Sequence, residues 1–234
     1  MEFNRVLLKL SGESLVGKQG YGIDQDRLAY FVGELKLAAE TGVQIAIVVG
    51  GGNIFRGLSG TLEGFDRQAG DYMGMLATTI NSLALQSELE REGLRCSLYS
   101  GFSIESVTRK MYGPEAIRDL EDGKIVIISG GTGNPYFTTD TASALRALEV
   151  KADAFLKGTR VDGVYSEDPE KNPQATRFFD ITFDEAYNKG LKIMDLTAFT
   201  LCKENKMPVV VFNMNKPGNL LKLLKGEKSG TIIS

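Results

Sequence analysis

The sequence predicts an α/β fold in which a central, mostly parallel sheet is covered by helices on both faces. Short apolar runs recur along the chain, and several of them, such as IAIVV, IVII and VVVF, are almost continuously hydrophobic. Runs of this kind are typical of strands that are buried on both faces. Stretches with helical spacing of apolar residues separate them, and this alternation favours a parallel sheet. Such folds bind ligands where the carboxyl ends of strands meet their loops.

The predicted elements follow this alternation from one end of the chain to the other. The strands share an apolar, β-branched composition and are Arg5–Leu10, Val43–Val49, Leu94–Tyr99, Lys124–Ser129, Ala152–Lys157 and Pro208–Asn213. The helices share apolar residues spaced by three or four and are Asp24–Glu40, Gly70–Glu92, Glu105–Leu120, Thr141–Glu149, Thr182–Lys189 and Asp195–Asn205. No linker, low-complexity tract or repeat interrupts the pattern. We therefore expect one domain over residues 1–234.

Composition excludes several classes of function. The chain has a net charge of −3, a pI of about 5.3 and 42% hydrophobic residues, so charge gives no case for binding nucleic acid or an anionic membrane. Histidine is absent, which removes imidazole bases and histidine-ligated metals. Cys96 and Cys202 have no partner at metal-ligand spacing. With no signal peptide and no apolar run near ~20 residues, we expect a cytoplasmic protein.

Three strand ends carry loops rich in glycine and polar residues. They are Lys9–Ser14 (KLSGES), Gly50–Arg56 (GGGNIFR) and Ser129–Asp140 (SGGTGNPYFTTD). Glycine allows backbone N–H groups to approach an anion closely, and the start of a following helix adds a favourable dipole. One such loop is weak evidence, because tight turns also use glycine. Three of them favour a polyphosphate site over structural turns.

Two common phosphate-binding motifs are nearly present but fail. Gly12–Lys18 fits GxxxxGK, but Gln19 stands where a serine or threonine should bind magnesium. We therefore interpret Lys18 as a solvated loop lysine. Gly131 and Gly133 begin a dinucleotide-binding fingerprint, but Pro135 and Tyr136 stand where a helix start and the third glycine belong.

The motifs KLSGE, GGGNIFRG, DYMGMLAT, GTGNPYFTTD, KGTRVDGVYSEDP, MDLTAFTLC and VFNMNKPGN, taken together, resemble the bacterial uridylate kinases of the amino-acid-kinase superfamily. The resemblance runs from about Arg5 to Ile232. It implies the three-layer α/β/α sandwich of that superfamily, with a UMP (acceptor) side at roughly 43–150 and an ATP side at roughly 151–234 that share one sheet. It also implies transfer of the γ-phosphoryl of ATP to UMP in pyrimidine nucleotide biosynthesis, with Mg²⁺ carried mainly by the phosphates and no metal bound by the protein alone.

The resemblance implies four catalytic positions. Lys9 matches the lysine that bridges the transferred phosphate, although a lysine at a strand end could also be solvated. Arg56 matches an arginine that holds the UMP phosphate, and the alternative is a surface arginine. Asp140 matches the aspartate that orients the lysine and the glycine amides, or it is only a helix cap. Lys157 is a second candidate cation. The role of Asp195, where related kinases have a second catalytic lysine, stays open.

On the acceptor side, the resemblance places Gly51 at the phosphate and Asp71 at the ribose hydroxyls. Taken alone, Asp71 reads more simply as the N-terminal cap of its helix. The remaining acceptor positions form the loop around uracil, ribose and phosphate, and they are Thr132, Gly133, Asn134, Pro135, Tyr136, Phe137, Thr138 and Thr139.

On the donor side, the resemblance implies that ATP is bound at Lys9, Leu10, Ser11, Gly12, Gly52, Arg56, Thr159, Tyr165 and Asp168. The ring of Tyr165 offers a face and Asp168 offers an acceptor for hydroxyls, although Asp168 before Pro169 also reads as a plain turn. A loop linked to GTP activation in some relatives matches Gly17, Lys18, Gln19, Gly20, Tyr21 and Gly22, and a glycine-rich hairpin loop is the alternative. The resemblance further implies a homohexamer, inhibition by UTP and no protein partner.

Two rival functions remain. One is an amino-acid kinase acting on carbamate, aspartate or isopentenyl phosphate, which the GTGNPYFTTD loop and Asp71 disfavour. The other is a non-catalytic binding or storage protein on the same scaffold. The presence of Lys9, Arg56, Asp71 and Asp140 favours turnover.

Overall fold

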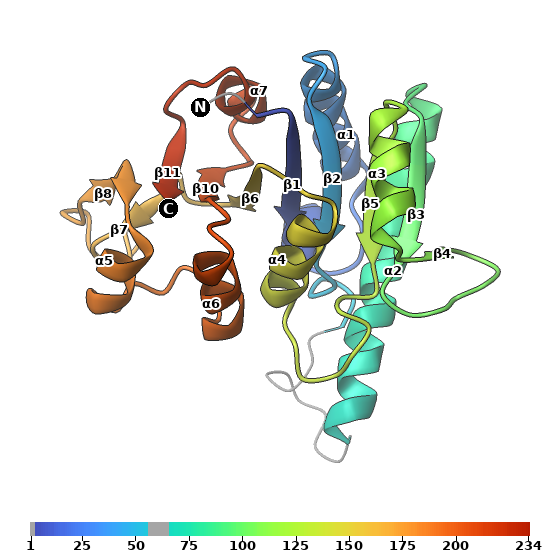
Figure 1. Ribbon diagram of the computed structural model, residues 1–234, viewed down its shortest axis with the longest axis horizontal. Coiled ribbons are helices and arrows are strands. Elements are labelled where there is room, and N and C mark those ends of the chain that lie inside the picture. The colour runs from blue at the N-terminus through green and yellow to red at the C-terminus, as the bar shows by residue number, and fades with distance from the viewer. Residues whose placement is uncertain (1–2, 56–65) are drawn as a thin grey trace.

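The fold is organised around one nine-stranded sheet (Figure 1). The computed structural model describes residues 3–55 and 66–234. Strand β1 (Arg5–Leu10) lies inside the sheet between β2 (Gln44–Val49) and β6 (Ala154–Thr159), and both neighbours run parallel to it. The chain therefore leaves β1 on one side and returns to it on the other, which makes the carboxyl end of β1 a topological switch point.

The other strands extend the sheet outward from these three. The order is β4-β3-β5-β2-β1-β6-β10-β11-β9. The other strands of this sheet are β3 (Cys96–Ser100), β4 (Arg109–Lys110), β5 (Ile125–Ser129), β9 (Asp180–Ile181), β10 (Val209–Asn213) and β11 (Gly230–Ile233). Among the described residues, β10 with β11 is the one antiparallel pair of this sheet. A separate ribbon pairs β7 (Val164–Tyr165) with β8 (Arg177–Phe178).

Helices cover both faces of the sheet, and each face has its own apolar cluster. The first cluster packs one face against α1 (Gln25–Ala39), α2 (Arg67–Arg91) and α7 (Asn219–Leu224). The second packs the other face against α3 (Gly113–Glu121), α4 (Thr139–Glu149), α5 (Phe183–Asn188) and α6 (Leu196–Glu204). This arrangement confirms the predicted three-layer α/β/α fold.

The alternation of side chains along the central strands decides where the charged groups lie. In β1, Val6, Leu8 and Leu10 belong to the α1 and α2 cluster, whereas Leu7 belongs to the α4 cluster. Because successive side chains of a strand point to opposite faces, Lys9 lies on the same face as Leu7, beneath α4. The same alternation in β6 places Lys157 on the face of Phe155, which also belongs to the α4 cluster.

The predicted strands agree with the structure within two residues at each end, but one predicted helix is wrong. The stretch 105–112 forms turns and the short β4, and α3 begins only at Gly113, with Pro114 in its first turn. Proline fits the first turn of a helix but disrupts its interior, so the helix cannot extend back through this position. The sequence prediction also lacks α7, β11 and the short strands β4 and β7–β9.

None of the helices within residues 3–55 and 66–234 combines the length and the apolar character that a membrane crossing requires.

A buried carboxylate, Asp119 of α3, ties that helix to the edge of the sheet. It accepts hydrogen bonds from Tyr99 Oη at 2.7 Å, Lys124 Nζ at 2.5 Å and Arg109 Nη1 at 3.2 Å. Burial alone would raise the pKa of Asp119, but the bonds from Lys124 and Tyr99 outweigh it and lower this pKa to about 2. The ionised carboxylate therefore stabilises the folded state.

We expect Asp119→Asn to remove an acid-sensitive part of the stability. Because the folded pKa lies below the ordinary 3.8, the contribution is complete above about pH 4 and is lost as the pH falls toward 2, with a size of about 2 kcal/mol. Urea denaturation at pH 6 and at pH 3 should show a gap between wild type and variant that narrows at the lower pH. Glu121→Gln, at the exposed pair with Arg5, is the control and should change stability by less than about 1 kcal/mol. A gap that is independent of pH would contradict the assignment.

Candidate active site

Loops rich in glycine meet at the carboxyl edge of four neighbouring strands, β5, β2, β1 and β6. The loop after β1 touches the loop after β2 so closely that a Cβ atom on Gly12 would lie 2.5 Å from the Gly50 carbonyl oxygen. Gly51 packs in the same way against α2, where a Cβ atom would lie 2.8 Å from the Gly74 carbonyl oxygen. These glycines are required for the loops to approach one another, and their backbone N–H groups stay close to the switch point.

Two lysines stand side by side at this edge. Lys9 and Lys157 are register partners on the parallel pair β1 and β6. Between them lies Asp140 in the first turn of α4, with Lys9 Nζ 3.1 Å from Oδ1 and Lys157 Nζ 2.5 Å from Oδ2. Lys157 Nζ also donates to the Ile193 carbonyl at 2.6 Å. All three side chains are at most 15% exposed, so Lys9 is not a solvated strand-end residue.

Burial and the neighbouring charges shift the pKa values of Asp140 and Lys157 in this cluster. Burial raises the pKa of Asp140, but the charges of Lys9 and Lys157 outweigh it, and the net pKa is below its ordinary value. Burial lowers the pKa of Lys157, and the carboxylate of Asp140 opposes that effect. The cluster therefore contains one carboxylate between two cations, which leaves net positive charge facing the glycine loops.

Asp140 is not the cap of α4. The hydroxyl of Thr138 fills that role by accepting from the Thr141 backbone N–H at 3.1 Å, and Asp140 lies inside the first turn. The prediction that Asp140 caps a helix beginning at Thr141 is therefore wrong. Because the helix begins earlier, at Thr139, the Asp140 carboxylate points to the lysines instead of to the backbone.

Asp195, whose role the sequence left open, caps α6 and joins it to α4. Its Oδ1 accepts from the Ala198 N–H at 3.0 Å and from Thr141 Oγ1 at 2.9 Å, and its Oδ2 accepts from Thr138 Oγ1. It also lies close enough to Lys157 for its charge to raise the pKa of that lysine. Its contacts hold the amino ends of the two helices together beside the lysine pair.

The loop after β5 is shaped by residues with positive φ. Gly130, Gly131 and Gly133 have φ values of +69°, +58° and +86°, which glycine adopts without strain. Tyr136 also has a positive φ of 74°. The buried side chain of Arg146 donates to the Gly131 carbonyl at 2.9 Å, so α4 holds this loop from behind.

Asp71 binds the same loop from the other side. Its Oδ2 accepts from the Tyr136 backbone N–H at 2.7 Å and from Arg67 Nε at 2.9 Å. The alternative that Asp71 caps its helix is wrong, because α2 begins at Arg67 and its cap is Asp66. Asp71 thus stands on the side of α2 that faces the predicted acceptor loop, whose Asn134, Tyr136, Phe137 and Thr138 are exposed.

A cleft of about 910 Å³ opens on the α1 side of the lysine pair. Lys9, Ser11, Lys157 and Thr159 line it from the strand ends, and Lys18 lines it from the loop opposite. Lys18 is exposed, as predicted. The segment Gly17–Gln19 is a short 3-10 turn and α1 begins only at Gln25, so the chain does not form a P-loop.

The residues 17–22 do not form a hairpin either, because no strand flanks them in the structure. Gly17, Gly20 and Gly22 all have positive φ, while Gln19 and Tyr21 are exposed. The hairpin alternative is therefore wrong, and the segment is an irregular glycine-rich loop at the mouth of the cleft.

A second pocket, of about 590 Å³, lies on the other side of Lys157. Thr159, Tyr165 and Asp168 line it, so the structure brings together the three residues predicted to bind adenosine. Asp168 also accepts from the Glu170 backbone N–H at 3.0 Å, which makes it a turn residue as well. Lys157 lines both cavities and is the point where they meet.

Some predicted residues lie elsewhere. The side chain of Leu10 is buried in the α1 and α2 cluster, so only its backbone is near the site. Gly51, Asp71 and the whole predicted acceptor loop Thr132–Thr139 line neither the cleft nor the second pocket. Gly52 lies in the turn beside Gly51, and Arg56 is outside the described residues.

Other cleft residues were not singled out from the sequence. Arg27 of α1 donates from Nε to the Ser14 carbonyl at 2.9 Å and from Nη2 to Asn215, and all three residues line the cleft. Arg160 lines both cavities. Asn215 and Arg160 lie within motifs that carried the resemblance, but Arg27 sits in an ordinary helical pattern that gives no signal of its position.

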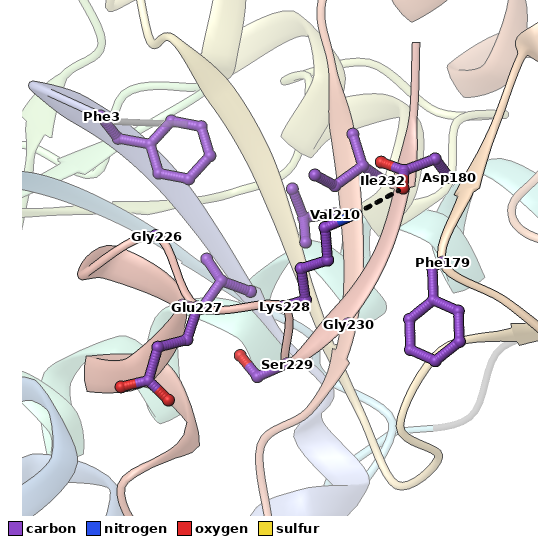
Figure 2. A pocket seen from close by; sticks show the side chains of 11 residues that line it. Phe3, Phe179, Asp180, Val210, Gly226, Glu227, Lys228, Ser229, Gly230 and Ile232 are labelled. Carbon is purple, nitrogen blue, oxygen red and sulfur yellow. Dashed lines mark hydrogen bonds and ion pairs between the residues drawn. The ribbon is translucent and has the colours of Figure 1, made fainter.

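A further small pocket lies away from this edge, near the amino-terminal end of β1 (Figure 2). It measures about 90 Å³ and is bounded by the rings of Phe3 and Phe179. Lys228 Nζ and Asp180 form an ion pair at 3.4 Å across it. None of the predicted site residues lines this pocket.

Residues 3–55 and 66–234 contain no group of three or more Asp, Glu, Cys or His side chains placed to hold a metal ion. Mg²⁺ prefers several oxygen ligands and commonly takes them from substrate phosphates and water. The described residues therefore fit a magnesium ion that arrives with phosphates better than one held in a protein cage.

Adjacent glycine loops, a lysine pair held by a buried aspartate and two adjoining cavities define a protein that binds phosphorylated ligands at a switch point. A sequence model of the amino acid kinase family matches residues 4–213. The chain is 57% identical over 232 residues to the uridylate kinase of Parabacteroides distasonis, covering 99% of this chain and 98% of the relative. The uridylate kinase of Porphyromonas gingivalis is 59% identical over 232 residues, 99% of this chain and 97% of that relative.

Solved structures agree with this result. The UMP kinase of Bacillus anthracis superposes with a TM-score of 0.96 at 34% identity, covering 100% of this chain and 97% of that one. The UMP kinase of Ureaplasma parvum superposes with a TM-score of 0.93 at 35% identity, covering all of both chains. The chain belongs to the amino acid kinase family and, within it, to the uridylate kinases.

We expect Asp195→Ala to lower the free energy of unfolding by about 2 kcal/mol, because it removes the cap of α6 and two hydroxyl partners. Asp195→Asn keeps a capping oxygen and should cost less than about 1 kcal/mol. Urea denaturation measures both. Thr182→Ala, which removes the cap of α5, is the matched control at about 1 kcal/mol. Equal stability of wild type and Asp195→Ala would refute the structural role.

Proposed function

We propose that this protein transfers the γ-phosphoryl group of ATP to UMP, giving ADP and UDP for pyrimidine nucleotide biosynthesis. The observation that carries the proposal is the Lys9–Asp140–Lys157 cluster at the switch point, where the cleft meets the second pocket. The similarity to curated uridylate kinases over nearly the whole chain supports the choice of UMP.

The chemistry of this reaction suits a site without histidine. The acceptor is a phosphate oxygen that is already ionised, so the reaction needs little help from a general base. The main difficulty is to bring two anionic nucleotides together and to stabilise the charge on the transferred group. Lys9, Lys157 and the backbone N–H groups of Gly12 and Gly51 offer fixed positive charge and dipoles for that purpose.

On the donor side, we propose that adenosine occupies the second pocket. The ring of Tyr165 would contact the base and the carboxylate of Asp168 would accept from ribose hydroxyls. The triphosphate would then pass Thr159 and Lys157 to reach Lys9, Ser11 and Gly12 in the cleft. This path follows the residues that the two cavities share.

On the acceptor side, we propose that UMP lies against the Thr132–Thr139 loop, with its ribose at Asp71 and its phosphate near Gly51. Asp71 already binds the Tyr136 N–H, so one carboxylate would hold both the loop and the nucleotide. Arg56 is proposed as a phosphate ligand on the resemblance alone. We further propose one domain over residues 1–234, with the acceptor side at roughly 43–150 and the donor side at roughly 151–234, because β2 and β6 flank β1 in one sheet.

Magnesium is proposed as the cofactor, held mainly by ATP phosphates, where it would neutralise charge on the β- and γ-phosphoryl oxygens. The protein residues that act beside it are the two lysines and the glycine amides. Asp140 would hold both lysines in place and would favour the charged form of Lys157, so it contributes through them.

We also propose a homohexamer with activation by GTP at Gly17–Gly22 and inhibition by UTP. An apolar stripe on α2 supports self-association, since a helix face with large exposed apolar residues is typical of an interface. Its members recur at helical spacing and are 39% to 50% exposed: Tyr72, Leu76, Ile80 and Leu83. The free thiols of Cys96 and Cys202 support a reducing compartment such as the cytoplasm.

The substrate is tested by ADP release in a coupled assay with ATP and UMP, CMP, dUMP or carbamate as acceptor. We expect UMP to give the highest kcat/KM, and Lys9→Ala to lower turnover by at least ~10²-fold, because it removes one charge that stabilises the transferred group. Lys225→Ala, a lysine at the end of α7 outside both cavities, is the control and should match wild type. A preference for another acceptor would overturn the proposal. Unchanged turnover in Lys9→Ala would show that Lys9 does not stabilise the transferred group.

We expect Asp140→Asn to change the pH dependence of turnover as well as its size. The carboxylate of Asp140 opposes the effect of burial on the pKa of Lys157. Without it that pKa falls further, so the lysine loses its charge at a lower pH and the alkaline decline of kcat moves to lower pH. Initial rates with ATP and UMP across pH 6 to about pH 10 measure this shift. Asp119→Asn, a buried aspartate at the β3–β4 edge of the sheet and outside both cavities, should leave the profile unchanged. An Asp140→Asn profile parallel to that of wild type would contradict the role given to the carboxylate.

A further inference from the structure

A buried amide group lies in the middle of α2, directly behind the glycine loop that follows β2. Asn81 is fully buried, although a polar side chain in a core is costly unless hydrogen bonds satisfy it. It lines neither the cleft nor the second pocket. Its hydrogen bonds therefore decide what it does.

Asn81 makes three hydrogen bonds to the Gly50–Asn53 segment. Its Nδ2 donates to the Gly50 carbonyl at 2.7 Å and to Asn53 Oδ1 at 2.7 Å. Its Oδ1 accepts from Asn53 Nδ2 at 2.9 Å. The side-chain amides of Asn81 and Asn53 thus form a reciprocal hydrogen-bonded pair. Together with the bond to Gly50, this pair fixes the first and the last residue of the glycine turn, with Gly51 and Gly52 between them.

Asn53 continues the network to the next loop. Its Nδ2 also donates to the Gly22 carbonyl at 2.8 Å, and its own carbonyl accepts from the Gly22 N–H at 3.0 Å. The same side chain packs against the loop after β1, because a Cβ atom on Gly12 would lie 2.5 Å from Asn53 Oδ1. One amide pair therefore contacts three glycine-containing loops at the phosphate-binding edge.

We infer that Asn81 is a positioning residue that acts through Asn53 to hold the Gly50–Gly52 backbone, and that this network links the glycine turn to the loop at Gly22. The inference rests on the proposed function, which places the Gly51 and Gly52 amides at substrate phosphates. A helix is a rigid support, and a displacement of about 1 Å in a positioning group can cost about 10²-fold in rate. Asn81 connects helix α2 to the Gly50–Asn53 turn, whose glycines have no side chains that could hold the backbone in place.

The first test uses the wild-type protein and amide hydrogen exchange with and without UMP plus a non-hydrolysable ATP analogue. The proposed function predicts slower exchange at Gly51 and Gly52 when the nucleotides bind. The inference adds slower exchange at Gly22, whose N–H donates to Asn53. Protection at Gly51 and Gly52 without protection at Gly22 would overturn the inference alone, whereas no protection at the glycine turn would count against the proposed function.

The second test compares Asn81→Ala with Leu85→Ala, one turn further along α2. Leu85 is buried in the α1 and α2 cluster, so its truncation weakens the packing of the same helix without touching the amide pair. We expect both variants to have a lower melting temperature. Only Asn81→Ala should lower kcat at saturating ATP and UMP by about tenfold or more, change the KM values less than kcat, and abolish the nucleotide-dependent protection at Gly22.

A purely structural role would give a different result. Asn81→Ala would then match Leu85→Ala, with a lower melting temperature and a kcat within twofold of wild type, and the inference would be wrong. If Asn81→Ala does not fold, the exchange pattern of the wild type at Gly22 decides the question by itself.

Discussion

The register of β1 against β6 places Lys9 and Lys157 next to one another, and the active site depends on the carboxylate that compensates them. Two lysines on neighbouring strands repel one another, and burial makes Lys157 more costly to charge. Asp140 offsets both effects by binding the two ammonium groups with its two oxygens. Its own place is set by the early start of α4, which in turn is fixed by the Thr138 cap and by the contacts of Asp195 to Thr138 and Thr141. A chain of ordinary helix-capping interactions thus ends at the Lys9–Asp140–Lys157 cluster.

The glycine loops pose the opposite problem, because the proposed function requires them to approach anions closely and yet stay in place. Glycine permits the approach but has more conformational freedom to lose than any other residue. The protein restricts that freedom from outside the loops. Asn81 and Asn53 bind the turn after β2, while Arg146 and Asp71 bind the loop after β5 from opposite sides. Asn81 and Asp71 belong to α2 and Arg146 belongs to α4, so helical side chains support the loop backbone, while Asn53 does so from within its own turn.

The sequence was sufficient for those features that depend on local pattern. The boundaries of β1 and the position of the three glycine loops follow from apolar runs that end in glycine, and the failure of the P-loop motif follows from one residue, Gln19. The sequence was insufficient for features that depend on contacts between residues far apart in the chain. The turns before Pro114 read as helix because their composition permits it. Asp71 and Asp140 read as caps because they stand near helix starts, but the true caps come earlier in the chain, at Asp66 and Thr138. The Asn53–Asn81 pair spans 28 residues, and no local pattern marks two distant asparagines as partners.

The position of β1 has a consequence for how the chain is made. Of the strands that the structure describes, β1 comes first in chain order and yet is an inner strand of the sheet, and its second neighbour, β6, begins only at Ala154. Until then the nascent chain carries an apolar strand with one edge unpaired, which is a template for pairing with other chains. Parallel neighbours so far apart in sequence also close slowly. The same topology that brings Lys9 to Lys157 therefore leaves one edge of β1 unpaired until the residues of β6 have been made.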